Sequence, residues 1–88
     1  MQQEEFMALL TREAFQETVT VQREANGEMA IHTHPFEAKA LILQGQLEIS
    51  VDGGERLYRV GDVFHLAANA PHAERYGPDG VTYLVGRK

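Results

Sequence analysis

The chain has 88 residues, 13 acidic and 8 basic, so its formal net charge at pH 7 is −5 with neutral histidines. This length suits one domain, and 43% hydrophobic with 24% charged residues is typical of an ordered globular chain. The acidic balance argues against nucleic-acid binding, which needs clustered Lys and Arg. The absence of cysteine excludes a disulfide scaffold and thiolate chemistry. The acidic start and the lack of a long apolar run indicate neither a secretory signal nor a membrane segment, so we expect a cytoplasmic protein.

The first segment of the chain, from Gln3 to about Glu13, has a helical pattern of apolar residues. Phe6, Leu9 and Leu10 fall at helical spacing, and the early glutamates suit a helix N-terminus. The sequence therefore predicts a short amphipathic helix. A frayed tail is the alternative, because so short a helix is marginal without tertiary contacts.

After Phe15 the apolar period changes to two, as in β-strands. Alternating or apolar runs are separated by turns that contain glycine. The expected strands cover residues 18–23, 29–33, 38–43, 46–51, 56–60, 63–66, 72–76 and 81–85. Eight short strands favour an all-β sandwich or barrel, and closure into a barrel avoids long exposed edges. We therefore expect residues 1–16 to carry the helix, packed on a barrel of residues 17–88.

Three of the four histidines lie at positions that suggest a metal site. His32 and His34 are two apart on an expected strand, so their side chains point to the same face. His72 directly follows Pro71 at the head of another strand. Imidazoles from neighbouring strands that converge inside a small barrel can bind a divalent transition metal. On spacing alone, solvent-facing histidines are an equally open interpretation. The fourth, His65, alternates with core-like neighbours and is expected to face solvent.

These histidines and several turn residues resemble the two signature motifs of the cupin superfamily. The matching positions are His32, His34 and Gly45 in the first motif, and Gly61, Asp62 and His72 in the second. The resemblance extends from about Val19 to the C-terminus and is similar to a group of very small bacterial cupins. It implies a small jelly-roll β-barrel that pairs as a homodimer. A homodimer is also expected physically, since so small a barrel has a limited core and exposed edges.

The sequence departs from the family pattern in both motifs. The glutamate of the first motif would fall at Ala38, which cannot bind a metal. Glu37 lies one position early and points away by strict alternation, unless a bulge at Pro35-Phe36 restores its direction. Glu37 is therefore either a metal ligand or a surface carboxylate. In the second motif Asn69 replaces a glycine, and asparagine tolerates the left-handed backbone that the turn needs.

Glu74 is the other candidate carboxylate, because it shares a strand face with His72. If His72 points inward, Glu74 does too, and a buried carboxylate needs a partner. That partner is either a metal beside the imidazoles or an arginine at the barrel mouth, from the set Arg56, Arg59 and Arg75. One divalent ion (Fe, Mn, Ni, Cu or Zn) is the expected cofactor. Its candidate ligands are His32, His34, His72, Glu37 and Glu74.

Histidine ligands with open coordination positions can polarise a substrate oxygen, activate water or, with a redox metal, handle dioxygen. The resemblance implies the same range, since cupins include dioxygenases, sugar isomerases and epimerases, and decarboxylases, besides non-catalytic members. Two hypotheses follow: a metal-dependent reaction of oxygenase or isomerase type on a small molecule, and non-catalytic binding or sensing of a small ligand. A structural subunit with vestigial histidines is a third. In each of the first two the partner is a small molecule, with no nucleic acid and no membrane.

Overall fold

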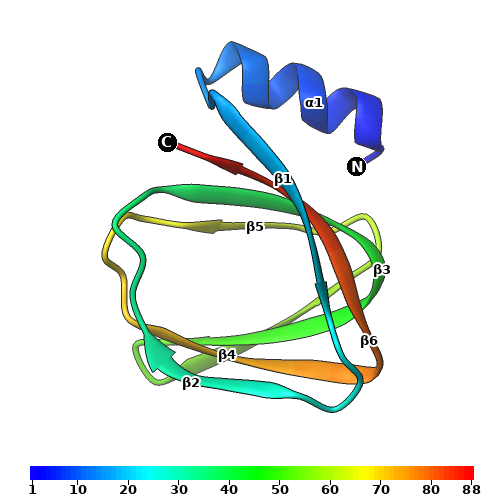
Figure 1. Ribbon diagram of the computed structural model, residues 1–88, viewed down its shortest axis with the longest axis vertical. Coiled ribbons are helices and arrows are strands. Elements are labelled where there is room, and N and C mark those ends of the chain that lie inside the picture. The colour runs from blue at the N-terminus through cyan, green and yellow to red at the C-terminus, as the bar shows by residue number, and fades with distance from the viewer.

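In the computed structural model, which describes residues 1–88, the alternating segments form one antiparallel sheet that folds over on itself (Figure 1). The helix and strands are α1 (Gln3–Arg12), β1 (Glu17–Arg23), β2 (Glu28–His32), β3 (Ala38–Val51), β4 (Gly54–Arg59), β5 (Val63–Leu66) and β6 (His72–Arg87). The expected all-β class with one short N-terminal helix is therefore confirmed.

The structure has six strands where the sequence predicts eight, because two pairs of expected strands are continuous. β3 passes through Gly45, and β6 passes through residues 77–80, which we expected to form a turn. The register between β3 and β6 shifts from Ile42 to Gln44 and again from Gly45 to Leu47. Glycine inside a strand often marks such a bulge, at which the strand bends without ending. The expected breaks are therefore bends.

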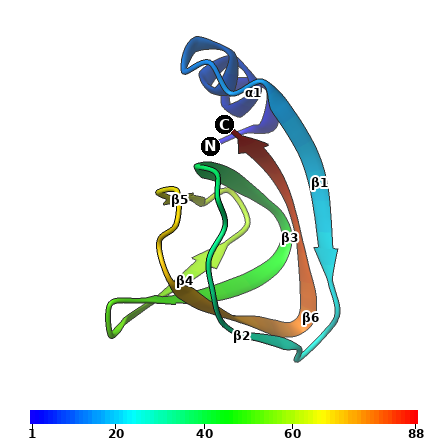
Figure 2. The same cartoon turned by 60° about the vertical axis from the view of Figure 1, so that its left-hand side comes forward.

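These bends let β3 and β6 contribute to both layers of the barrel. Residues 38–45 and 81–87 pair with each other and with β5 and β1. Residues 46–51 and 72–76 pair with each other and with β4 and β2. Each layer therefore has four strand segments, in the orders β1-β6-β3-β5 and β2-β6-β3-β4, as in a small jelly roll. Figure 2 shows both long strands turning the corner of the barrel.

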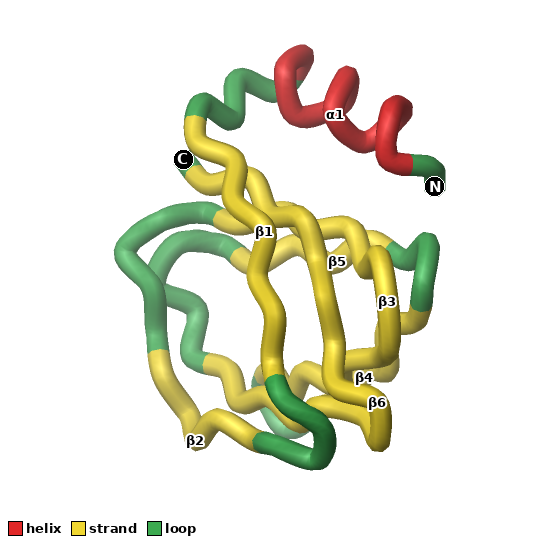
Figure 3. The backbone as a smooth tube through the Cα atoms, turned by 45° about the vertical axis from the view of Figure 1, so that its right-hand side comes forward, coloured by secondary structure: helices red, strands yellow, loops and turns green.

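Side chains from both layers meet inside the barrel and form the main core. Its buried members are Ala38, Ala40, Ile42, Leu47, Ile49, Phe64, Tyr76, Val81, Tyr83 and Val85. A second cluster lies outside the barrel, where α1 covers part of β3 and β6 (Figure 3). It consists of Phe6, Leu10, Phe15, Leu41 and Leu84. The burial of Phe6 and Leu10 excludes the frayed-tail alternative. With ten residues, α1 is too short to span a membrane.

Two connections between the layers lie side by side along one side of the barrel (Figures 1 and 3). Residues 33–37 join β2 to β3, and residues 67–71 join β5 to β6. Asn69 has a φ of 62° and donates its backbone N–H to the carbonyl of His34 over 2.7 Å. The expectation that asparagine adopts the left-handed backbone here is therefore confirmed. This hydrogen bond ties the connection that carries His34 to the connection that leads into β6.

Candidate metal centre

Three histidines and one glutamate gather where β2 ends and β6 begins, next to these connections. His32, His34, His72 and Glu74 each offer a donor atom, and these atoms all lie within 4.8 Å of one another. Strand pairing brings them together, because His32 is paired with His72 across β2 and β6. Glu74 lies two residues after His72 and so on the same face of β6. His72 and Glu74 are buried, whereas His32 and His34 are half-buried.

Backbone carbonyls fix the tautomers of two of the imidazole rings. Nδ1 of His32 donates to the carbonyl of Ala30 over 2.7 Å, and Nδ1 of His72 donates to that of Ala70 over 2.9 Å. A neutral ring that donates through Nδ1 carries no proton on Nε2, so the lone pair of Nε2 is free. Both Nε2 atoms are buried and have no hydrogen-bond partner. Such a carbonyl-oriented ring is typical of a metal-binding histidine.

The same two Nε2 atoms face a single carboxylate oxygen. Oε2 of Glu74 lies 3.2 Å from Nε2 of His32 and 3.4 Å from Nε2 of His72. Lone pairs and a carboxylate repel one another unless a cation lies between them. Donor atoms bound to one transition metal at about 2.0–2.2 Å lie roughly 3 Å apart. The donor types, the tautomers and the spacing therefore fit a divalent transition metal, which this group can hold.

His34 is the remaining imidazole of the group, and its surroundings favour the neutral form. Burial, followed by the neighbouring His32 and His72, lowers the pKa of His34. Its ring stacks on the ring of Phe36, with centroids 5.0 Å apart and planes 16° from parallel. A neutral imidazole is the form that binds a metal, so the environment of His34 suits it for that purpose.

Two tyrosines adjoin Glu74. The hydroxyl of Tyr76 donates to Oε1 of Glu74 over 3.3 Å. Burial, and after it the charge of Glu74, raises the pKa of Tyr76 to about 12 and that of Tyr83 to about 12. Both hydroxyls therefore stay protonated at neutral pH and are available as hydrogen-bond donors. Alternation along β6 places Tyr76 on the same face as Glu74, but the sequence carries no signal of the contact between the two side chains.

Glu37 does not belong to this group. Its Oε2 lies 2.6 Å from Nε2 of His65, whose side chain is 49% exposed. The hydrogen bond with His65 lowers the pKa of Glu37. Of the two interpretations of Glu37, the geometry favours the surface carboxylate. The expectation that His65 faces solvent is confirmed.

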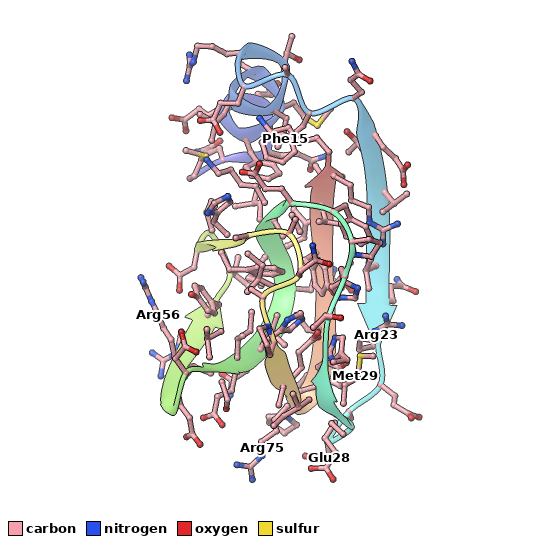
Figure 4. The ribbon with its side chains drawn as sticks, turned by 90° about the vertical axis from the view of Figure 1, so that its left-hand side faces the viewer. Phe15, Arg23, Glu28, Met29, Arg56 and Arg75 are labelled. Atoms are coloured by element: carbon pink, nitrogen blue, oxygen red, sulfur yellow. The ribbon has the colours of Figure 1, made fainter.

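No arginine provides the partner of Glu74. Of the three considered from the sequence, Arg75 pairs with Glu48, while Arg56 and Arg59 form no ion pair. Figure 4 shows the labelled Arg56 and Arg75 extending away from the barrel. The imidazoles are therefore the polar neighbours of the Glu74 carboxylate, together with one tyrosine hydroxyl.

A cavity of about 60 Å³ lies beside the histidine–glutamate group. Its hydrophobic and aromatic wall consists of Val21, Met29, Phe36, Ala38, Phe64, Leu66, Tyr83 and Val85. An apolar wall around a few convergent polar groups is typical of a small-ligand site. Arg23 and Arg87 also line the cavity, and the sequence reasoning missed both. Strand alternation, continued along β1 and β6 from the apolar wall residues, leads to each arginine and could have found them.

The fold is a small β-barrel whose histidine–glutamate group could hold a metal, and comparison with known proteins identifies its family. The cupin domain family matches residues 19–82, which is well over half of the sequence. The chain therefore belongs to the cupin family. No curated protein matches it significantly.

Solved structures support the same fold. A protein of unknown function from Rhizobium leguminosarum aligns with a TM-score of 0.75 at 14% identity, over 80% of this chain and 66% of its own. An RmlC-like cupin from Shewanella frigidimarina gives 0.68 at 18% identity, over 80% of this chain and 63% of its own. The DMSP lyase DddQ from Ruegeria pomeroyi gives 0.73 at 28% identity, over 81% of this chain and 36% of its own. The chain thus spans 36–66% of the length of these proteins.

Proposed function

We propose that this protein is a metal-binding cupin that acts on a small molecule in its barrel cavity. One observation carries the proposal: the buried Nε2 atoms of His32 and His72 face Glu74 and have no hydrogen-bond partner. One divalent ion held by these three residues and His34 would satisfy both nitrogens. Three imidazoles and one carboxylate are compatible with Fe, Mn, Ni, Cu or Zn.

When bound, such an ion supplies a Lewis acid or, if redox-active, dioxygen chemistry. The residues of the chain supply positioning and surroundings. The carbonyls of Ala30 and Ala70 hold two rings with Nε2 directed at the site. Tyr76 holds one oxygen of Glu74, which leaves the other to face the imidazoles. Tyr83 lines the cavity as a protonated hydroxyl and can donate a hydrogen bond to a ligand there.

The protein could act on its small molecule in two ways, by catalysing a reaction or by binding without catalysis. Similarity to the DMSP lyase DddQ, at 28% identity, supports catalysis and adds a lyase-type reaction to the oxygenase and isomerase types. One observation favours the alternative, a non-catalytic binding or sensing module. Every imidazole and carboxylate in the cavity wall belongs to the proposed metal site, so none is free as a separate general acid or base. Turnover or oxygen uptake in a screen of small molecules separates the two functions.

Metal analysis tests the proposal directly. Purified protein is expected to contain about one divalent ion per chain by inductively coupled plasma mass spectrometry, because the cluster offers one set of ligands. His32→Ala, His34→Ala and His72→Ala are each expected to lose most of this metal. His65→Ala is the matched control and is expected to retain it, since His65 lies on the exposed face.

Circular dichroism would establish that each variant remains folded. Protein that is isolated without metal, and that also fails to bind added Mn²⁺, Fe²⁺, Ni²⁺ or Zn²⁺, would overturn the proposal.

A further inference from the structure

Arg87 is a partly buried cation held against the cavity wall. Its guanidinium carbon lies 4.9 Å from the centre of the Phe36 ring, and the other neighbour of that ring is His34, stacked 5.0 Å away. Nη1 of Arg87 donates to Oε1 of Glu17 over 3.3 Å. The guanidinium group is therefore fixed from two sides, close to one imidazole of the proposed metal site.

The rest of this guanidinium group has no partner. The bond to Glu17 is the one side-chain hydrogen bond that Arg87 makes, and its Nε is buried without a partner. Its Nη2 makes no hydrogen bond and, unlike Nε, is not enclosed. The N–H groups of Nη2 can therefore donate charge-assisted hydrogen bonds to a carboxylate oxygen of a ligand.

The charge of the cavity wall also favours an anion. Arg23 lines the cavity and forms no ion pair, and Figure 4 shows it beside Met29 at the end of β1. Glu74 is the one acidic residue in the wall, and in the proposed function the bound metal offsets its charge. Positive charge is therefore concentrated in the cavity of a chain whose net charge is −5. Such a local field attracts anionic ligands.

We infer that the ligand is a small carboxylic acid whose carboxylate binds Nη2 of Arg87 and whose remaining atoms extend toward the histidines. A cavity of about 60 Å³ has room for roughly four to six non-hydrogen atoms. The apolar wall, which makes up most of the lining, suits a short carbon chain. The inference deepens the proposed function, because the metal site would act on the end of the ligand remote from Arg87.

Matched pairs of acids and amides test the charge of the ligand. Lactate and propanoate would be titrated against their neutral counterparts lactamide and propanamide, with binding followed by ¹H–¹⁵N NMR of Zn²⁺-loaded and of EDTA-treated protein. Each acid is expected to bind at least about tenfold more tightly than its amide, since the amide lacks the charge-assisted hydrogen bonds. Arg87→Gln is expected to abolish this preference. Arg75→Gln, whose side chain is 69% exposed and remote from the cavity, is the control and is expected to keep it.

A second variant tests the inference without removing Arg87. Glu17 is a 62% exposed competitor for the guanidinium group, so Glu17→Gln is expected to strengthen binding of the acids. Equal binding of acid and amide, failure of both acids to bind, or an unchanged preference in a folded Arg87→Gln protein would overturn the inference. Preferential binding of inorganic phosphate would overturn it too.

The two proposals can fail separately. Protein that binds no metal but still prefers the acids would contradict the proposed function alone. Protein that binds metal but does not distinguish acid from amide would contradict the anionic ligand alone.

Discussion

At the scale of single residues, Glu37 and Glu74 show that side-chain direction decides the role of a carboxylate. Both were candidate ligands, and both lie close in sequence to a histidine of the group. The Glu74 side chain is 8% exposed and faces the Nε2 atoms of His32 and His72, while that of Glu37 is 33% exposed and contacts His65. Only Glu74 is placed where an oxygen can complete a metal shell.

Substitution of these two carboxylates separates their roles. Glu74→Gln is expected to weaken metal binding at least about tenfold, because the variant replaces a charged oxygen donor with a neutral amide. Glu37→Gln is the control and is expected to leave the affinity unchanged. Competition with a chromogenic chelator, using Zn²⁺ or Ni²⁺, measures both. Comparable weakening in the two variants would contradict the placement of Glu74 in the metal site.

At the scale of elements, the bend in the two long strands depends on glycine. Gly45 and Gly80 have φ values of 73° and 72°, a region that side chains other than glycine rarely adopt. A Cβ on Gly45 would overlap the carbonyl oxygen of Gly80 on the neighbouring strand. The backbones of β3 and β6 thus approach closely where both pass from one layer to the other. The close approach lies between the half of β6 that begins at His72 and pairs with β2 and the half that pairs with β1.

Two glycine variants isolate the effect of that close approach. Gly53 in the β3–β4 turn has a similar φ of 77°, but nothing lies within 4 Å of its would-be Cβ. Gly53→Ala is expected to lower the free energy of unfolding by about 1–2 kcal/mol through backbone strain alone. Gly45→Ala is expected to lose a further ~1–3 kcal/mol through overlap with the neighbouring strand. Urea denaturation measures the free energy of unfolding of both variants. Equal losses would contradict the prediction, because they would show that the overlap at Gly45 costs nothing.

At the scale of the whole molecule, the barrel leaves several strand edges without a neighbour. β1 and β2 each pair only with β6, and β4 and β5 each pair only with β3. Unpaired edges favour association, and a barrel of 88 residues has little core of its own. A homodimer, joined through a sheet and the N-terminal helix, therefore remains our prediction for the working form.

Light scattering after size-exclusion chromatography checks the homodimer. The expected mass is about twice the 9.9 kDa of one chain. Met7, which is 39% exposed on α1, is expected to lie in the interface, so Met7→Glu should shift the protein toward monomer. Leu57→Glu is the control, because Leu57 is 38% exposed on β4, in the layer that the helix does not cover. A monomer at every concentration, or an equal effect of the two variants, would contradict the prediction.

The local pattern of residues was sufficient to predict much of this protein. Alternation every two residues located the β segments, and it showed that His32 shares a face with His34 and that His72 shares one with Glu74. The helical spacing of Phe6 and Leu10 predicted α1, which ends one residue before the expected limit. Such features depend on neighbours in the chain, so the sequence alone determined them.

Long-range pairing decided the rest. Whether Gly45 ends a strand or bends it depends on the strand that lies beside it, and that partner is more than thirty residues away in sequence. The partners of Glu37 and Glu74, and the position of Arg87 in the cavity wall, depend likewise on which faces turn inward when the sheet closes. Only the tertiary structure could decide these points, because each is a contact between segments that meet only after folding.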